Sequence, residues 1–163
     1  MPQTVPEFLD LLKALNANRV RYVVVGGLAM VFQGSTYTTF DLDFAISTDA
    51  ETVAAVVQAL APFHPYPPRY GSARSFVWDA RSFVGAVVEL ATEAGFVDIL
   101  RVQPGVDSFE GLHERSEVRH VFDVAVRVAS IDDLIAMKQA ADRPKDRDHI
   151  NQLRALKALR QPS

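Results

Sequence analysis

The stretch Thr39-Phe40-Asp41-Leu42-Asp43-Phe44 places two acidic residues two positions apart between apolar neighbours. In an extended strand, side chains at i and i+2 point to the same face, so Asp41 and Asp43 would lie side by side. Two carboxylates at that range repel each other, and Mg²⁺ relieves the repulsion because carboxylate oxygens are among its preferred ligands. The pair therefore indicates a metal site, although the polar face of an amphipathic edge strand is the other interpretation of so short a pattern.

The residues just upstream, Arg21-Tyr22-Val23-Val24-Val25-Gly26-Gly27-Leu28-Ala29-Met30, indicate a strand, a tight turn and the start of a helix. The β-branched valines favour the strand, and the Gly26-Gly27 step allows a turn with positive φ. Backbone N–H groups at such a turn can approach an anion, so a triphosphate could bind there. A plain strand-to-helix turn that needs small residues for packing is the alternative interpretation.

These two features together resemble the signature of the DNA polymerase β-like nucleotidyltransferases. In that superfamily a Gly-[Gly/Ser] turn precedes an Asp-x-[Asp/Glu] pair, and here thirteen residues separate Gly27 from Asp41. The segment Val97-Asp98-Ile99-Leu100 resembles the strand that carries the third metal-binding acid of the superfamily. Residues 130–138 are similar to the helix that follows in its minimal members, and residues 143–150 to their closing helix.

The resemblance implies an enzyme that moves an NMP from an NTP to a hydroxyl group of a tRNA, a protein or a small molecule, with two Mg²⁺ ions as cofactors. It also implies which residues act. The metal-binding and catalytic acids would be Asp41, Asp43 and Asp98, with Lys138 as a further catalytic residue, and the nucleotide would contact Gly26, Gly27, Thr39 and Lys138. Lys138 is equally compatible with an exposed position on an amphipathic helix.

The chain is similar to the small AbiEii-like and minimal nucleotidyltransferases, which are often one half of bacterial toxin–antitoxin or phage-defence pairs. A cognate toxin or antitoxin is therefore an implied partner. Tyr37 and Phe40 depart from the pattern, because such proteins often carry an arginine and a polar residue there. Loss of the arginine removes a phosphate contact, so a nucleotidyltransferase-fold binding module or antitoxin subunit without turnover is a second hypothesis. His149 would either orient substrate or cap the helical bundle.

Asp98 lies in an apolar run, between Val97 and Ile99, that should be buried, and an unpaired charge is costly there. Metal coordination beside the other two acids would compensate the charge, and so would a core arginine or backbone amides. The strand register between residues 74 and 100 is not determined by the sequence. Glu89 and Asp79 are therefore reserve candidates for the third acid.

Composition indicates one compact domain. With 163 residues, 48% of them hydrophobic, the chain is long enough for one core and short for two, so we expect a single unit over 1–163. Its sheet core should span about 20–128 and its C-terminal helices about 130–160. The absence of cysteine excludes disulfides and thiolate metal sites. Without a leader pattern or a membrane-length apolar run, a cytoplasmic location is expected.

Charge is unevenly distributed along the chain. Residues 134–163 hold seven Lys or Arg against three Asp, a net charge of +4, which leaves −7 for the rest of a chain whose net charge is −3. A basic C-terminal region beside an acidic pocket would suit an anionic substrate such as RNA. The region holds no aromatic residue, so a solvated helix face is the favoured interpretation.

Hydrophobic periodicity predicts helices and strands that interleave without strict βαβ repetition. Helices are expected at 6–15, 28–33, 51–60 and from about 131 and 146, and strands at 22–25, 41–46, 75–78, 87–90, 96–100, 118–121 and 124–128. Asp49 or Thr48 would cap the third helix, and the proline-rich residues 62–68 form a loop. The expected class is α+β, with a nucleotidyltransferase-like mixed sheet flanked by helices and a C-terminal helical pair.

Overall fold

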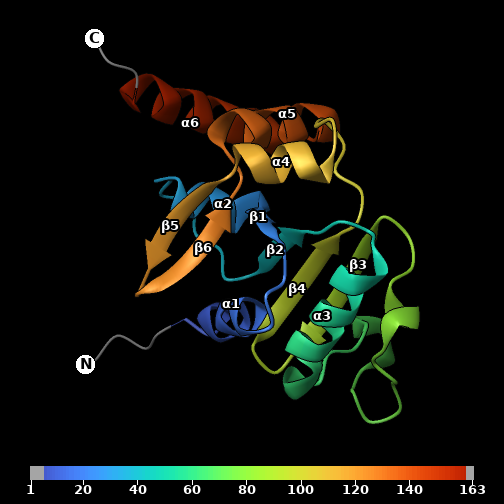
Figure 1. The fold of residues 1–163 in the computed structure, drawn as a ribbon. Coiled ribbons are helices and arrows are strands. Elements are labelled where there is room, and N and C mark those ends of the chain that lie inside the picture. Colours follow the sequence, from blue (N-terminus) through green and yellow to red (C-terminus); the bar gives the residue numbers. More distant parts are fainter. Residues whose placement is uncertain (1–5, 161–163) are drawn as a thin grey trace.

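A mixed six-stranded sheet forms the centre of the protein in the computed structural model, which describes residues 6–160 (Figure 1). The strand order is β3-β4-β2-β1-β6-β5, and parallel pairs (β2 with β4, β1 with β6) alternate with antiparallel ones. The strands are β1 (Val23–Val25), β2 (Leu42–Ala45), β3 (Val87–Thr92), β4 (Gly95–Leu100), β5 (Glu117–Val121) and β6 (Val124–Val128). The expected mixed sheet of an α+β protein is therefore confirmed.

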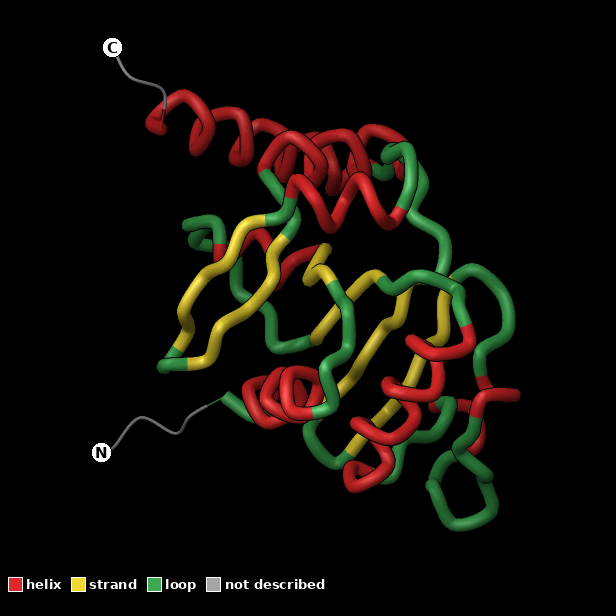
Figure 2. Tube along the Cα trace, viewed as in Figure 1, coloured by secondary structure: helices red, strands yellow, loops and turns green. Residues whose placement is uncertain are grey.

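Helices lie on both sides of this sheet in the described residues. They are α1 (Phe8–Ala17), α2 (Gly26–Phe32), α3 (Ala50–Leu60), α4 (Phe109–Arg115), α5 (Ile131–Ala141) and α6 (Pro144–Arg160). Helices α1 and α3 pack against each other on one side, whereas α4, α5 and α6 gather at the opposite side of the molecule (Figures 1 and 2). The predicted C-terminal helical pair is confirmed, because α5 packs along α6.

Buried apolar side chains from these layers form one continuous core. The leucines of α1, the three valines of β1 and the β2 residues Leu42 and Phe44 are all part of it. All three residues of β1 are buried, as expected for a strand at the centre of a covered sheet. Asp49 caps α3 as predicted, accepting a hydrogen bond from the Thr52 N–H at 2.8 Å. No helix in residues 6–160 is both long and apolar enough to cross a membrane.

Three details of the predicted elements were wrong. Residues 75–78 form no strand, because the Trp78 indole instead donates a hydrogen bond to the Val57 carbonyl of α3 and packs on Phe83. Helix α4 was not predicted, although Ser108 caps it. Helix α6 begins at Pro144 rather than near 146, since proline is well tolerated in the first turn of a helix.

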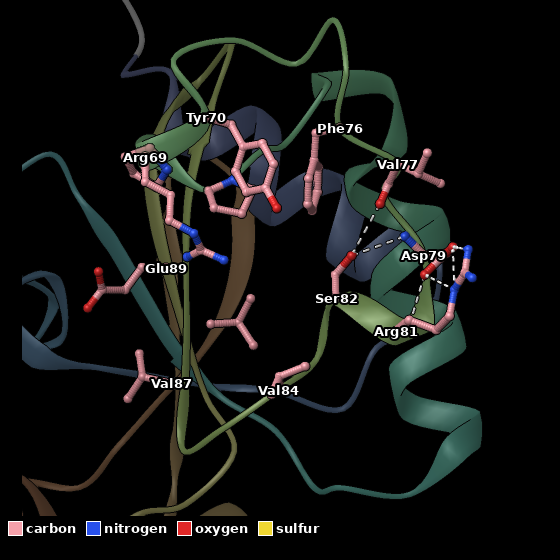
Figure 3. Close-up of a pocket in the computed structure, with 13 residues that line it drawn as sticks. Arg69, Tyr70, Phe76, Val77, Asp79, Arg81, Ser82, Val84, Val87 and Glu89 are labelled. Carbon is pink, nitrogen blue, oxygen red and sulfur yellow. Dashed lines mark hydrogen bonds and ion pairs between the residues drawn. The ribbon is translucent and has the colours of Figure 1, made fainter.

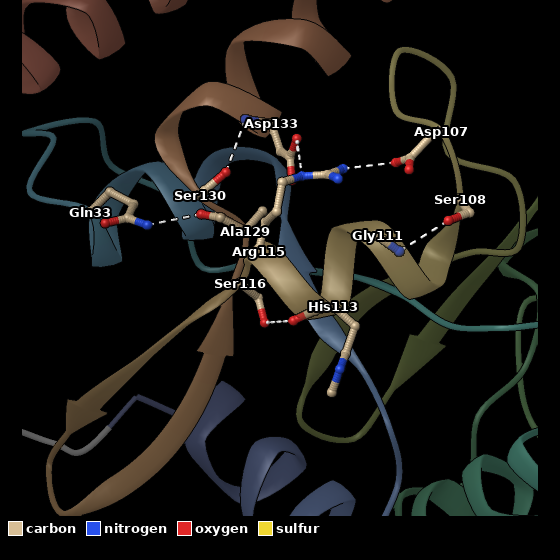
Figure 4. A network of polar contacts seen from close by, with 10 residues as sticks. All are labelled: Gln33, Asp107, Ser108, Gly111, His113, Arg115, Ser116, Ala129, Ser130 and Asp133. Carbon is tan, nitrogen blue, oxygen red and sulfur yellow. Dashed lines mark hydrogen bonds and ion pairs between the residues drawn. The ribbon is translucent and has the colours of Figure 1, made fainter.

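A polar network joins α4 to α5 and so holds α5 over the sheet (Figure 4). Arg115 Nε donates to both carboxylate oxygens of the buried Asp133, at 3.1 and 2.9 Å, and its Nη2 donates to Asp107 at 2.8 Å. Ser130 caps α5 by accepting from the Asp133 N–H. These contacts fix the position of α5, which carries Lys138.

Candidate active site

Three carboxylates lie side by side across neighbouring strands. Parallel pairing sets Asp43 of β2 beside Asp98 of β4, and antiparallel pairing sets Glu89 of β3 on the other side of Asp98. Directly paired residues share a face of the sheet. The sheet register thus brings Asp43 and Asp98 together as predicted, and adds Glu89, the reserve candidate.

Asp41 lies one residue before β2 rather than within it. The strand is short because its partner β1 ends at Val25, the residue paired with Asp43, where the chain turns into α2. Asp41 is exposed, and Thr39 Oγ1 accepts a hydrogen bond from its N–H at 3.3 Å. As placed, no three Asp, Glu or His side chains of residues 6–160 are close enough to hold one ion.

The acids nevertheless influence one another strongly. Burial raises the pKa of Asp43 to about 7, and the negative charges of Asp98 and Asp41 add to the effect. The pKa of Asp98 is also raised, first by burial and then by Glu89 and Asp41. Within the described residues, no hydrogen-bond donor or cation pairs with any of the four carboxylates. Such a cluster is a poor structural element and a good cation-binding one.

The Gly26-Gly27 turn touches this cluster directly. Gly26 has a φ of +70°, and a Cβ at this position would lie 2.3 Å from Asp43 Oδ2. A Cβ on Gly27 would lie 2.7 Å from Tyr37 Cε1 and 3.1 Å from Thr39 Cγ2. The predicted positive φ is therefore present, and close packing also requires both glycines.

A cavity of about 360 Å³ separates the acids from α5. Gly26 and the three strand carboxylates line its sheet side, whereas Lys138, Met137 and Arg143 line its helix side. The positive charge of Lys138 partly offsets the raised pKa of Asp43. The hydrogen bond to Asp146, and then the charges of Asp146 and Asp43, raise the pKa of Arg143. Lys138 is buried, so its interpretation as an exposed lysine was wrong. The cavity has one acidic and one basic wall.

Lys138 is held in place by the first turns of α6. Its Nζ lies 3.0 Å from His149 Nδ1 and 3.6 Å from Asp146 Oδ1. Burial and the neighbouring Lys138 lower the pKa of His149, so the imidazole is neutral at pH 7. Its Nδ1 then accepts a hydrogen bond from the Lys138 ammonium group. The Tyr37 ring packs edge-on against His149 at 4.8 Å between centroids. His149 therefore contributes to the helical bundle by supporting Lys138.

Asp146 is the buried anion of this group, only 1% exposed. Arg143 donates to it through its backbone N–H, Nε and Nη2 at 2.9 to 3.1 Å. These bonds lower the pKa of Asp146 to about 2. Sequence reasoning missed Arg143 and Asp146 as parts of the site, although their i, i+3 spacing at a helix start was a usable signal.

We expect Asp146→Asn to lower the free energy of unfolding by about 3 kcal/mol at pH 7, because it leaves the buried Lys138 and the half-exposed Arg143 without their anion. Since the folded-state pKa is depressed, the stabilisation is present above the unfolded pKa near 4 and is lost as the pH falls through about 2. Urea denaturation at several pH values measures the free energy of unfolding of both proteins. The difference between Asp146→Asn and the wild type should become smaller as the pH falls. Asp148→Asn, an exposed change on the same helix, is the control.

Asp79, the other reserve acid, lies away from the acidic row. It caps the 3₁₀ turn Ala80–Ser82 and pairs with Arg81 at 2.6 Å. Its carboxylate is therefore already satisfied by a cation and by the Arg81 N–H. The structure excludes it as the third acid of the row.

The order of the mixed sheet, with acids that face Lys138 and Arg143 across a cavity, is that of a nucleotidyltransferase fold. A family model described as "Nucleotidyltransferase of unknown function (DUF6036)" matches residues 3–160, and the chain belongs to this family. A comparison with curated proteins gave no match.

Solved structures support the same fold. The lincosamide antibiotic adenylyltransferase LnuA, in its lincomycin-bound crystal structure, is similar with a TM-score of 0.63 and 18% identity, over 94% of this chain and 98% of that one. A candidate nucleotidyltransferase from Thermotoga maritima (TM1012) is similar with a TM-score of 0.55 and 18% identity, over 97% of each chain. At these identities the likeness concerns the fold.

Proposed function

We propose that this protein transfers an NMP from a Mg²⁺-bound NTP to a hydroxyl acceptor. The observation that carries the proposal is the cavity between Asp43, Asp98 and Glu89 on one side and Lys138 and Arg143 on the other. An NTP with its metal is an anion that carries a cation. A cavity with one acidic and one basic wall complements both charges.

The residues fit Mg²⁺ on chemical grounds. All the ligands on offer are carboxylate oxygens, the donors that Mg²⁺ prefers. Burial, followed by the negative charges of Asp98 and Asp41, raises the pKa of Asp43, and a bound cation would offset both effects. Asp41, Asp43 and Asp98 would hold the metal, and the exposed loop position of Asp41 lets it approach the other two. Bound Mg²⁺ stabilises charge on the phosphates and lowers the pKa of an attacking hydroxyl.

The remaining residues orient the reactants. Lys138 and Arg143 bind phosphate oxygens, Lys138 as a point charge and Arg143 through the guanidinium N–H groups that do not donate to Asp146. The Gly26-Gly27 backbone can lie directly against the triphosphate, because neither residue has a side chain. Thr39 positions Asp41 by accepting a hydrogen bond from its backbone N–H. Asp98 accepts the proton of the attacking hydroxyl.

Incorporation of label from each of the four α-³²P NTPs, with Mg²⁺, into the RNA, protein and small-molecule fractions of a cell lysate tests this proposal. We expect transfer with the wild type and a loss of about 10³-fold in Asp98→Asn, equivalent to several kcal/mol of transition-state stabilisation. Asp123→Asn, in the exposed turn between β5 and β6, should retain full activity. Equal labelling by wild type and Asp98→Asn would refute the assignment.

A role in a toxin–antitoxin or defence pair is a finer part of the proposal, and it rests on the AbiEii-like resemblance of the sequence alone. Affinity purification of the tagged chain from its own cells tests for such a partner. A stoichiometric protein that is retained by wild type and by Asp98→Asn alike would indicate a partner subunit that binds independently of turnover.

A further inference from the structure

A second and larger cavity, of about 680 Å³, adjoins the one just described (Figure 3). Val87 and Glu89 of β3 line both cavities, so the two are neighbours at the acidic row. The other walls come mostly from residues 67–84, the segment that leads from α3 towards β3. Nothing in the nucleotide-binding role of the first cavity accounts for this one.

Exposed apolar side chains gather in this hollow. Tyr70, Val77, Val84 and Val87 all line it, and they are 49%, 68%, 72% and 42% exposed. Single apolar residues on a surface are ordinary, but a group of them in a concavity marks a binding site. A volume between about 300 and 1,000 Å³ is typical of small-molecule sites.

Tyr70 and Phe76 lie at one end of the hollow, with Val77 beside Phe76, and Val84 and Val87 lie at the other end (Figure 3). The Phe76 ring lies 5.2 Å from that of Tyr70, and the Arg69 guanidinium lies 5.3 Å from the Tyr70 centroid. These contacts fix the Tyr70 ring at the edge of the cavity, where it is exposed to solvent. Such a surface suits the apolar ring or alkyl part of a small molecule.

Charge around the cavity disfavours a polyanion. The charges of its four charged lining residues, Arg69, Asp79, Arg81 and Glu89, sum to zero, and Asp79 already neutralises Arg81. The adjoining acidic row makes the end nearest the nucleotide negative. Two cations of the basic C-terminal region also have partners within the molecule, since Arg160 binds Gln33 and Lys157 pairs with Asp132. RNA would need a basic wall here.

The geometry points to this cavity as the acceptor site, and to an acceptor that is a small hydroxylated molecule with an apolar body and no negative charge. The inference rests on the proposed nucleotidyl transfer and deepens it. The acceptor hydroxyl reaches past Glu89 to the acidic row, where its oxygen bonds to the α-phosphorus. The bond from that phosphorus to the bridging oxygen breaks, pyrophosphate leaves with the electron pair, and the hydroxyl proton passes to Asp98.

Valine-methyl NMR of the full chain tests the cavity with phenyl β-D-glucopyranoside, an uncharged, hydroxylated compound with an apolar ring. At up to about 10 mM of this probe, within the range of weak binding, the methyl signals of Val77, Val84 and Val87 should shift. Val118, an exposed valine on the distant edge strand β5, should not. Val84→Asp should weaken binding about tenfold, and Val118→Asp should leave it unchanged. Unmoved signals of the three valines would overturn the proposal.

Two further results separate this proposal from the proposed function. Mg²⁺·ATP should shift the methyl signal of Met137, which lines the nucleotide cavity. If Mg²⁺·ATP left the Met137 signal unchanged while phenyl β-D-glucopyranoside shifted the valine signals, nucleotide binding would be refuted and the acceptor site would stand. Transfer assays should label the small-molecule fraction, with at least about a tenfold loss in Val84→Asp and none in Val118→Asp. Label that enters RNA or protein, equally with wild type and Val84→Asp, would overturn the acceptor site while preserving the transferase.

Discussion

Replacement of Asp43 by Asn is expected to remove nucleotidyl transfer and, at the same time, to stabilise the metal-free protein at pH 8. Activity should fall by about 10³-fold, because a metal-binding carboxylate is lost. The stabilisation follows from the pKa of Asp43, which burial and its acidic neighbours raise to about 7. At pH 8 the wild type carries an ionised Asp43 in surroundings that disfavour the charge, whereas Asn has nearly the same shape and no charge.

The sign of the pH dependence follows from the raised pKa. An acid that binds its proton more tightly when folded stabilises the protein fully below the unfolded pKa near 4, and this stabilisation is lost as the pH rises through about 7. Wild type and Asp43→Asn should therefore be similar near pH 4. Above pH 7 the variant should have the higher free energy of unfolding, by about 4 kcal/mol.

Urea denaturation of both proteins between pH 4 and pH 8, with and without Mg²⁺, measures this difference. Mg²⁺ should stabilise the wild type at pH 8 and have little effect on the variant, since binding to the folded state alone raises its stability. Asp123→Asn serves as the control, because it removes an equal charge from an exposed turn. A variant less stable than wild type at pH 8 would contradict the predicted strain at Asp43.

Gly26→Ala should be the most destabilising small substitution in the site. Gly26 adopts a φ of +70°, which costs an L-residue about 1–2 kcal/mol, and its new Cβ would lie 2.3 Å from Asp43 Oδ2. Relief of that overlap moves either β2 or the turn, at a further cost of about 1–3 kcal/mol. We expect a total loss of about 4 kcal/mol, and impaired NTP binding because Gly26 lines the cavity.

Gly71→Ala provides a matched control for the backbone effect. Gly71 has a φ of +74°, and a Cβ there meets nothing within 4 Å. Its loss of about 1–2 kcal/mol by urea denaturation would measure the left-handed conformation alone. The double variant Gly26→Ala/Asp43→Ala should recover part of the Gly26→Ala loss, as expected for residues in direct contact. Equal losses for Gly26→Ala and Gly71→Ala would show that the overlap has no energetic effect.

The structure clarifies why some site residues were recognisable from the chain. Asp43 forms an Asp-x-Asp pair with Asp41, and Asp98 is a single acid within an apolar run; both are local patterns that need no knowledge of the fold. The glycine turn is similarly visible, because positive φ is a property of the residue type. Lys138 and Thr39 were identified through the family resemblance, and their roles in substrate binding stay predictions.

Local sequence thus determined the element types, the α+β class and the acids of β2 and β4, since periodicity, turn residues and charge in apolar runs are all short-range signals. Tertiary structure decided the strand register that adds Glu89 and excludes Asp79, the burial of Lys138 between β2 and α6, and the aromatic hollow built from residues 67–84. These features join residues far apart in the chain. They arise from tertiary packing. Residues 75–78, for example, have a local preference for a strand but instead contact α3 through Trp78.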